Sequence, residues 1–301
     1  MTLRDMLFTG LGLRLLAVFL LTAMSAAVHA AADSVPVGQI VFLRSAIALG
    51  PILIYMHLRG GIRPHLRTER PGAHLLRGAL GGLSIGLSFL SLARLPVASA
   101  EALSFLAPIL SLPLAALALG ERVGRWAVLA CLLGLGGTIL MLWSALELPT
   151  DGAALGVAAG LGFALTMAVV RVLVRDMTRT EPAASIAFSM ALISSLLALC
   201  TLPFGWVVPD AAAWRALVAT GLLGGLAAIA GTEAAARAPV STLAPIEYTG
   251  LVWALLFDVV LFATVPGWRA VAGGVTILAA ALIATLAPTG ARPGRGRTPP
   301  A

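Results

Sequence analysis

Long apolar segments alternate with short polar connections along almost the whole chain. Ten such segments cover residues 10–32, 36–57, 73–93, 96–119, 124–145, 151–172, 182–205, 212–234, 239–262 and 267–287. A helix of about 20 residues is about 30 Å long and therefore matches the hydrocarbon core of a bilayer. The segments lack the apolar–polar alternation typical of strands in outer-membrane barrels. The pattern predicts an all-α polytopic membrane protein with ten transmembrane helices.

Composition supports this class and excludes two others. Of 301 residues, 59% are hydrophobic and 11% are charged, and the mean hydropathy is +1.00. A water-soluble domain carries about 25% charged residues, and a disordered chain combines low hydrophobicity with high charge. Only residues 289–301, rich in Pro, Gly and Arg, have the composition of a disordered tail, which we expect in the cytoplasm.

The positive charges follow the ends of the apolar segments instead of forming one patch. The net charge is +7, and every basic residue other than histidine is an arginine. If the N-terminus is cytoplasmic, 16 arginines lie on the cytoplasmic side and three on the other. The positive-inside rule then predicts that both termini are cytoplasmic, and no nucleic acid partner is expected. An alternative interpretation is that the first span is a secretory signal that is cleaved near Ala30.

An internal repeat divides the chain into two halves. Residues 78–128 align with residues 221–271 at a constant offset of 143, including the Arg-x-Pro-Val motif at residues 94–97 and 237–240. We therefore expect two five-helix repeats, at residues 1–147 and 148–288. Because five is odd, equivalent helices cross the membrane in opposite directions. Inverted repeats of this kind are typical of secondary transporters whose substrate site lies between the halves.

Charged residues inside apolar segments are the first candidates for a functional site, because a charge at this depth is costly unless it faces a cavity or a partner. Arg44 is expected either to bind an anionic substrate group or to be tied to backbone carbonyls. Glu101 could complement a helix dipole. For Glu247 the sequence leaves open a proton site, a pair with Arg44 or contact with a substrate amino group. His29 and Asp258, near outer ends, are candidates for gating or proton-linked roles.

The fourth and ninth spans supply the uncharged candidates. Helix-breaking prolines at corresponding places in two halves point to a transport site, because freed carbonyls are tolerated where they line a cavity. The predicted substrate-binding set is therefore Arg44, Glu101, Ser104, Phe105, Pro108, Glu247, Tyr248 and Trp253. We expect the third, fourth, eighth and ninth spans to line the central cavity, with Arg44 reaching it from the second.

Several motifs resemble those of EamA-type transporters of the drug/metabolite transporter superfamily. They are RLPVASA at residues 94–100, LGER at 119–122, APVSTLAPIEYTG at 238–250, and the arginine of Phe42-Leu43-Arg44. The resemblance implies ten helices in two inverted repeats. Bacterial members with this architecture include exporters of amino acids, notably aromatic ones. The chain departs from the family pattern in having Ala263-Thr264 where Gly-Glu is expected, and Asp258 at a commonly apolar position.

Together these features predict a transporter of the bacterial inner membrane that exports amino acids or related small metabolites by alternating access. Enzyme motifs are absent from the sequence, and we expect no enzymatic activity, no cofactor and no metal. The expected partners are a small-molecule substrate and membrane lipid, and the expected state is a monomer. Two alternatives remain: export of drugs, nucleosides or other metabolites, and, from another class, a membrane-embedded enzyme or lipid scramblase.

Overall fold

The structure is a computed structural model that describes residues 10–32, 35–92, 94–95, 100, 103–143, 153–262 and 267–286. All regular secondary structure in these residues is helical, which confirms the predicted all-α class. The elements are α2 (Gly10–Ala32), α3 (Val37–Leu58), α4 (Ile62–Leu66), α5 (Pro71–Leu92), α7 (Ala107–Leu119), α8 (Arg125–Leu142), α9 (Ala153–Met177), α10 (Ala183–Leu199), η2 (Leu202–Phe204), α11 (Ala211–Arg237), α12 (Val240–Leu243), η3 (Ala244–Tyr248), α13 (Thr249–Phe262) and α14 (Trp268–Leu286).

Six helical segments in the described residues are long and apolar enough to cross a membrane. They are Val37–Leu58, Arg125–Leu142, Ala154–Met177, Ala211–Arg237, Val240–Phe257 and Trp268–Leu286. Their outward faces carry apolar side chains such as Ile54, Leu132 and Leu282, each more than half exposed. Exposed apolar side chains in this number fit contact with lipid. The chain is therefore a polytopic membrane protein, and the total of ten crossings stays a prediction.

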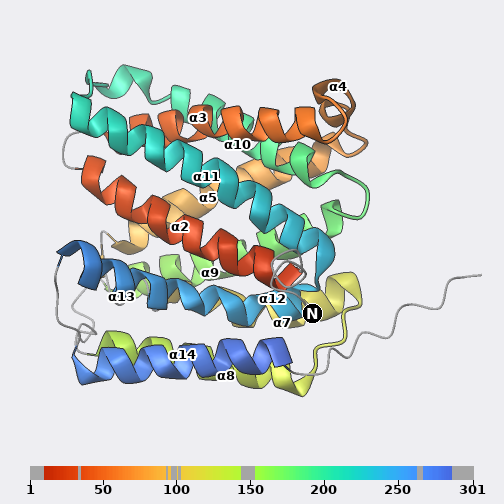
Figure 1. Ribbon diagram of the computed structural model, residues 1–301, viewed down its shortest axis with the longest axis vertical. Coiled ribbons are helices and arrows are strands. Elements are labelled where there is room, and N and C mark those ends of the chain that lie inside the picture. The colour runs from red at the N-terminus through yellow and green to blue at the C-terminus, as the bar shows by residue number, and fades with distance from the viewer. Residues whose placement is uncertain are drawn as a thin grey trace, which may run out of the picture.

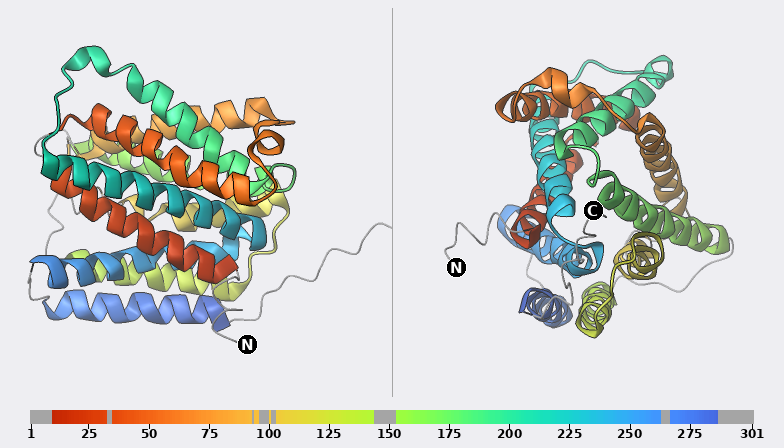
Figure 2. Two further views of the ribbon diagram at one scale, coloured as in Figure 1. Left: turned by 45° about the horizontal axis from the view of Figure 1, so that its top comes forward. Right: turned by 90° about the vertical axis from the view of Figure 1, so that its right-hand side faces the viewer.

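The long helices run side by side and are arranged around a common centre (Figure 1 and the right-hand view of Figure 2). At one end of the molecule α8 packs on α14, and at the other end α3 packs on α10. The sides are formed by α2 against α11 and by α5 against α9, while α7 packs on α9. Helices from the N-terminal and C-terminal halves thus alternate around the centre.

Glycines allow two of these helices to approach closely. A Cβ atom on Gly137 of α8 would lie 2.8 Å from the carbonyl oxygen of Gly273, and one on Gly273 of α14 would lie 2.5 Å from that of Gly137. Neither position leaves room for a larger residue. Close backbone approach at small residues is the usual way in which helices associate in membranes, where lipid removes the hydrophobic driving force.

Prolines interrupt the fourth and ninth predicted spans. In the ninth, α12 ends at Leu243, and the 3₁₀ helix η3, which contains Pro245, precedes α13. In the fourth, a turn at Phe105 and Leu106 precedes α7, and Pro108 lies at the start of that helix. Proline lacks the backbone N–H group that a continuous helix needs, so it is tolerated at a helix start and kinks or ends a helix elsewhere.

Candidate functional site

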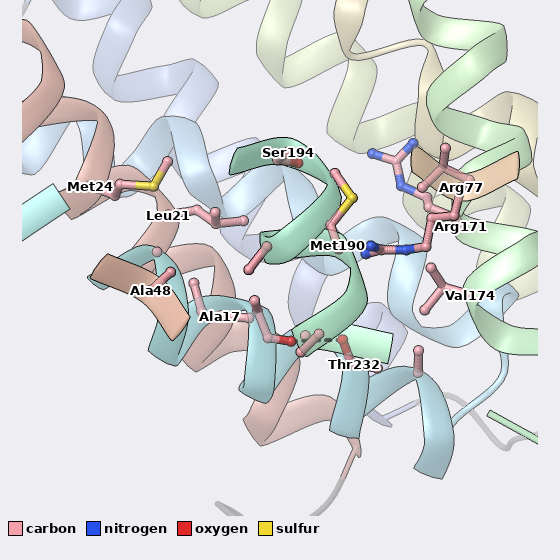
Figure 3. A pocket seen from close by; sticks show the side chains of 18 of the residues that line it. Ala17, Leu21, Met24, Ala48, Arg77, Arg171, Val174, Met190, Ser194 and Thr232 are labelled. Carbon is pink, nitrogen blue, oxygen red and sulfur yellow. Dashed lines mark hydrogen bonds between the residues drawn. The ribbon is translucent and has the colours of Figure 1, made fainter. Parts of the chain in front are cut away.

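A cavity of about 360 Å³ lies at the centre of the helix arrangement. Its size is within the range of pockets that bind small metabolites. Figure 3 shows many of its side chains, which come from helices of both halves of the chain. The wall is mainly apolar, and its charged residues are Arg14, Arg44, Arg77, Arg171 and Glu247.

The helices that line the cavity differ in part from those expected. α11 and α12 contribute as expected, and α5 contributes Arg77 alone. Most of the remaining lining comes from α2, α3, α9 and α10, while the described residues of α7 contribute none. The expected contribution of the fourth span is therefore wrong for α7. The reason is that α7 packs against α9, and α9 presents its own residues to the cavity.

Arg44 faces the cavity from α3, as expected for a buried cation. Its Nη1 atom lies 3.7 Å from the sulfur of Met24, which is the hydrogen-bond partner recorded for this guanidinium in the described residues. The neighbouring wall is glycine, since a Cβ on Gly224 would lie 3.8 Å from the Cγ of Arg44. A thioether is a weak acceptor, so most of the hydrogen-bonding capacity of Arg44 remains available to a ligand.

Glu247 is held between two arginines from different helices. The Nε of Arg171 donates a hydrogen bond to Oε1 of Glu247 at 2.7 Å, and the Nη2 of Arg171 donates to Oε2. Arg14 binds Oε1 from the other side. The Glu247 side chain is 11% exposed, and those of Arg14 and Arg171 are each 18% exposed. Among the roles that the sequence left open, Glu247 therefore has an ion pair, but with Arg14 and Arg171 instead of Arg44.

Sequence reasoning missed Arg14, Arg77 and Arg171 as cavity residues. It assigned all three to cytoplasmic helix ends, where arginine sets orientation. In the structure α9 continues to Met177, so Arg171 lies within a helix that continues for six more residues. Arg77 likewise lies six residues inside α5, whose first residue is Pro71. The signal in the sequence that bears on these arginines is how far each lies from the end of its predicted helix. Helix ends are the least certain part of a sequence prediction, so this distance did not identify them.

Four uncharged candidates, Ser104, Phe105, Pro108 and Tyr248, lie outside the cavity lining, and two of them pack against each other. Tyr248 is fully buried, and its hydroxyl donates to the carbonyl oxygen of Phe105 at 2.9 Å. The two rings stack with centroids 5.8 Å apart. Pro108 is fully buried, and neither it nor Ser104 lines the cavity. The structure thus joins Phe105 and Tyr248, the two equivalent positions of the repeat, at the two helix breaks.

The remaining candidates are separate from this cluster. Trp253 packs edge-on against Phe19, with ring centroids 5.1 Å apart, and does not line the cavity. Glu101 lies outside the described residues. His29 and Asp258 fall in α2 and α13, but their side chains are outside the described part. A substrate role for these four residues stays a prediction. No group of three or more potential metal ligands occurs among the described residues.

Two acidic residues, Glu121 and Glu181, connect loops to neighbouring helices on the face of the protein where α4 lies. Glu121, which follows α7, accepts hydrogen bonds from the backbone N–H groups of Val240 at 3.1 Å and Ser241 at 3.3 Å. These groups begin α12, and a helix N-terminus is stabilised by a carboxylate. Arg175 lies 3.7 Å from the same carboxylate. The LGER motif thereby fixes the start of the broken ninth span.

Glu181, between α9 and α10, has a similar role at the start of α5. Its carboxylate accepts hydrogen bonds from the Thr68 hydroxyl at 2.6 Å and from the backbone N–H groups of Glu69 at 2.9 Å and Arg70 at 3.1 Å. Burial alone raises the pKa of the Glu181 carboxyl, but these hydrogen bonds and the nearby imidazole of His74 lower it, with a net pKa below the ordinary value. The ionised form of Glu181 therefore stabilises the fold.

The EamA-like transporter family matches residues 8–143 and again residues 154–286. The chain belongs to this family. Curated relatives of this EamA-like chain include the pseudopaline exporter CntI of Pseudomonas aeruginosa, 29% identical over 92% of this chain and 96% of the relative. An uncharacterized transporter of Helicobacter pylori is 29% identical over 94% and 96%. A riboflavin transporter of Vibrio cholerae is 29% identical over 81% and 80%.

A solved protein structure has the same fold as this EamA-like chain. It superposes with a TM-score of 0.80 and 25% sequence identity, over 92% of this chain and 98% of that one. The family consists of transporters, so the chain is a membrane transporter, and a small-molecule substrate follows from the family. The names of the relatives differ in substrate, and the substrate of this chain has to be argued from its own cavity.

Proposed function

We propose that the chain is a secondary transporter that exports small carboxylate-bearing metabolites, amino acids among them, across the bacterial inner membrane. The observation that carries the proposal is the charge of the cavity, where four arginines face one glutamate, a formal charge of +3. Guanidinium groups match carboxylates with two parallel hydrogen bonds. A mainly apolar wall strengthens this attraction because little water screens it.

Arg44 is the first binding group for the substrate carboxylate in this proposal. Arg14 and Arg171 already bind the carboxylate of Glu247, whereas in the described residues Arg44 donates a hydrogen bond to the sulfur of Met24. The surrounding wall is made of small or flexible apolar residues, including Ala48, which suits side chains of varied shape. The same charge disfavours cationic drugs as substrates.

Alternating access between two inverted repeats, residues 1–147 and 148–288, is the mechanism that we propose. Contacts related by the repeat offset support it. A Cβ on Gly78 would meet Ile193 at 2.5 Å, and one on Gly221, its counterpart, would meet Ile47 at 2.5 Å. The packing of α2 on α11 likewise has its counterpart in α9 on α5. Two similar half-structures around one cavity allow inward-facing and outward-facing forms of similar energy.

A substrate screen tests the function. Cells that express the chain would be challenged with toxic amino-acid analogues, dipeptides, nucleosides and drugs, beside cells that express Arg44→Gln. We expect resistance to carboxylate-bearing compounds only, and we expect Arg44→Gln to abolish it. Resistance confined to compounds without an anionic group would contradict the proposal. Lipid-dye translocation in proteoliposomes provides the test for a scramblase, and we expect no activity there.

A further inference from the structure

Arg77 is a half-buried arginine that takes no part in the ion pairs described for the cavity. It lines the cavity from α5, and its Nε and Nη1 atoms are buried without a hydrogen-bond partner in the described structure. A buried guanidinium with unpaired N–H groups is unfavourable unless a ligand supplies the missing acceptors. This unused hydrogen-bonding capacity points to an anion that enters the cavity.

Arg171 adds a second open donor at the same end of the cavity. Its Nε and Nη2 atoms bind Glu247, whereas its Nη1 atom is buried with no partner in the described residues. Figure 3 shows Arg77 and Arg171 on one side of the cavity, from α5 and α9. One anionic group at this place would therefore meet donors from two arginines.

Arg44 lies at the opposite end. Its partner Met24 appears on the far side of the cavity from Arg77 and Arg171 in Figure 3. α3 and α5 are joined by the short segment that contains α4, so Leu58 and Pro71 mark the same face of the protein. Arg44 is 14 residues before Leu58 and Arg77 is six residues after Pro71, which places their backbones about 12 Å apart along the helix axes.

Apart from Arg44, Arg77 and Arg171, the charged residues among the described lining are Arg14 and Glu247, which pair with each other next to Arg171. Met190 and Ser194 of α10 lie between the ends in Figure 3, and Ala191 lines the same wall. Met190 lies 146 residues after Arg44, at the same offset that separates the matching residues Phe42 and Phe188 of the two halves. The cavity thus has Arg44 at one end, Arg77 and Arg171 at the other with the Arg14–Glu247 pair beside Arg171, and the uncharged wall of α10 between the two ends.

We propose that Arg77 and the open edge of Arg171 form a second anion subsite. The transported metabolite then carries two anionic groups, carboxylate or phosphate, at the ends of an uncharged segment. This inference rests on the proposed function and names the substrate class more narrowly than a carboxylate-bearing metabolite. One anionic group binds Arg44. The other accepts hydrogen bonds from the unpaired N–H groups of Arg77 and Arg171, beside the Glu247 ion pair.

Ligand-induced stabilisation of the purified full-length protein tests the second subsite. Apparent dissociation constants would be measured by thermal shift for straight-chain dicarboxylates of four to ten carbons, for monocarboxylates of the same lengths and for matched phosphonocarboxylates. The variants are Arg77→Gln, Arg77→Lys and Arg44→Gln. The control is Arg125→Gln, since Arg125 is an exposed residue stacked on Trp126 outside the cavity lining.

We expect at least one doubly anionic ligand to bind the wild-type protein about tenfold or more tightly than its singly charged match, as a further charge-assisted hydrogen-bonded group would. Arg77→Gln removes that advantage, because it weakens binding of the doubly charged ligand more than binding of its singly charged match. Arg77→Lys retains part of it, and Arg125→Gln changes neither affinity. The arm with the larger gain, dicarboxylate or phosphonocarboxylate, identifies the second group.

Two results contradict different parts of the account. Equal affinities for singly and doubly charged ligands, or an equal loss of both in Arg77→Gln, would overturn the second subsite and leave the proposed function standing. If no carboxylate or phosphonate stabilised the protein at all, the proposed function would fail together with the inference. Variants that elute as single species at the wild-type volume in size-exclusion chromatography are the ones compared.

Discussion

Glu247 forms ion pairs with two arginines in the described cavity, and this arrangement allows a quantitative prediction. Glu247 accepts hydrogen bonds from Arg14 of α2 and Arg171 of α9, so it joins the first helix of each half to the broken ninth span. Glu247→Gln removes the negative charge and keeps the shape of the side chain. The two arginines then face each other without a counter-ion, and the cavity charge rises from +3 to +4.

The expected cost follows from burial. Removal of one partner from a fully buried ion pair costs about 3–5 kcal/mol. Here the two arginine side chains are each 18% exposed and the carboxylate is 11% exposed, so water in the cavity offsets part of the loss. The glutamine oxygen also retains one hydrogen bond. We therefore expect about 2–3 kcal/mol, or a decrease in melting temperature of roughly 5 °C at about 2 °C per kcal/mol.

Thermal unfolding in detergent, followed by intrinsic fluorescence, measures this loss. Glu69→Gln is the matched control, since it makes the same chemical change at an exposed position. The double variant Glu247→Gln/Arg171→Gln restores the original balance of charge and should be less destabilised than the sum of its two single variants. A Glu247→Gln protein that melts within about 1 °C of wild type, as the control should, would refute the stabilising role of the pair.

Three further predictions concern the loops, the helix packing and the aromatic cluster. The pKa of Glu181 is lowered in the folded state, so its contribution to stability is present above the unfolded pKa of about 4.3 and is lost as the pH falls through the folded pKa. Glu181→Gln should therefore lower the melting temperature at pH 7 and reduce the further decrease of the melting temperature below pH 5. Gly137→Ala should cost about 1–3 kcal/mol in unfolding assays, whereas Gly136→Ala, with no atom within 4 Å of its added Cβ, should be neutral or stabilising. Tyr248→Phe should lower stability by about 1 kcal/mol and leave transport KM unchanged, because it loses one hydrogen bond to Phe105 outside the cavity lining; a selective rise in KM would instead place Tyr248 at the substrate.

The hydrophobic pattern was sufficient to predict the fold class and most helix positions. Segment length and apolar composition follow from the thickness of the bilayer, and this constraint acts locally along the chain. Arg44 and Glu247 were also found as candidates, because a charge in the middle of an apolar segment is costly whatever the tertiary arrangement. Both line the cavity.

The other cavity charges could not be recognised in the same way. Arg14 and Arg77 lie within two turns of a helix start, where arginine commonly faces the membrane surface. Only the packing of helices from both halves shows that these side chains face inward. Tyr248 presents the opposite case, since its position suggested a substrate contact. A Cβ on Gly134 would overlap its ring, so the absence of a side chain on α8 makes the space in which Tyr248 is buried.

Counterflow into proteoliposomes tests the central claim, that the arginine-rich cavity carries an anionic metabolite. A labelled carboxylate identified by the resistance screen would be measured with wild-type protein, Arg44→Gln and the exposed control Arg125→Gln. The account predicts that Arg44→Gln lowers kcat/KM for counterflow by at least about tenfold, through a higher KM or a complete loss of transport. Arg125→Gln should keep kcat/KM within about twofold of the wild-type value. Unchanged affinity and rate in Arg44→Gln for that carboxylate would contradict it.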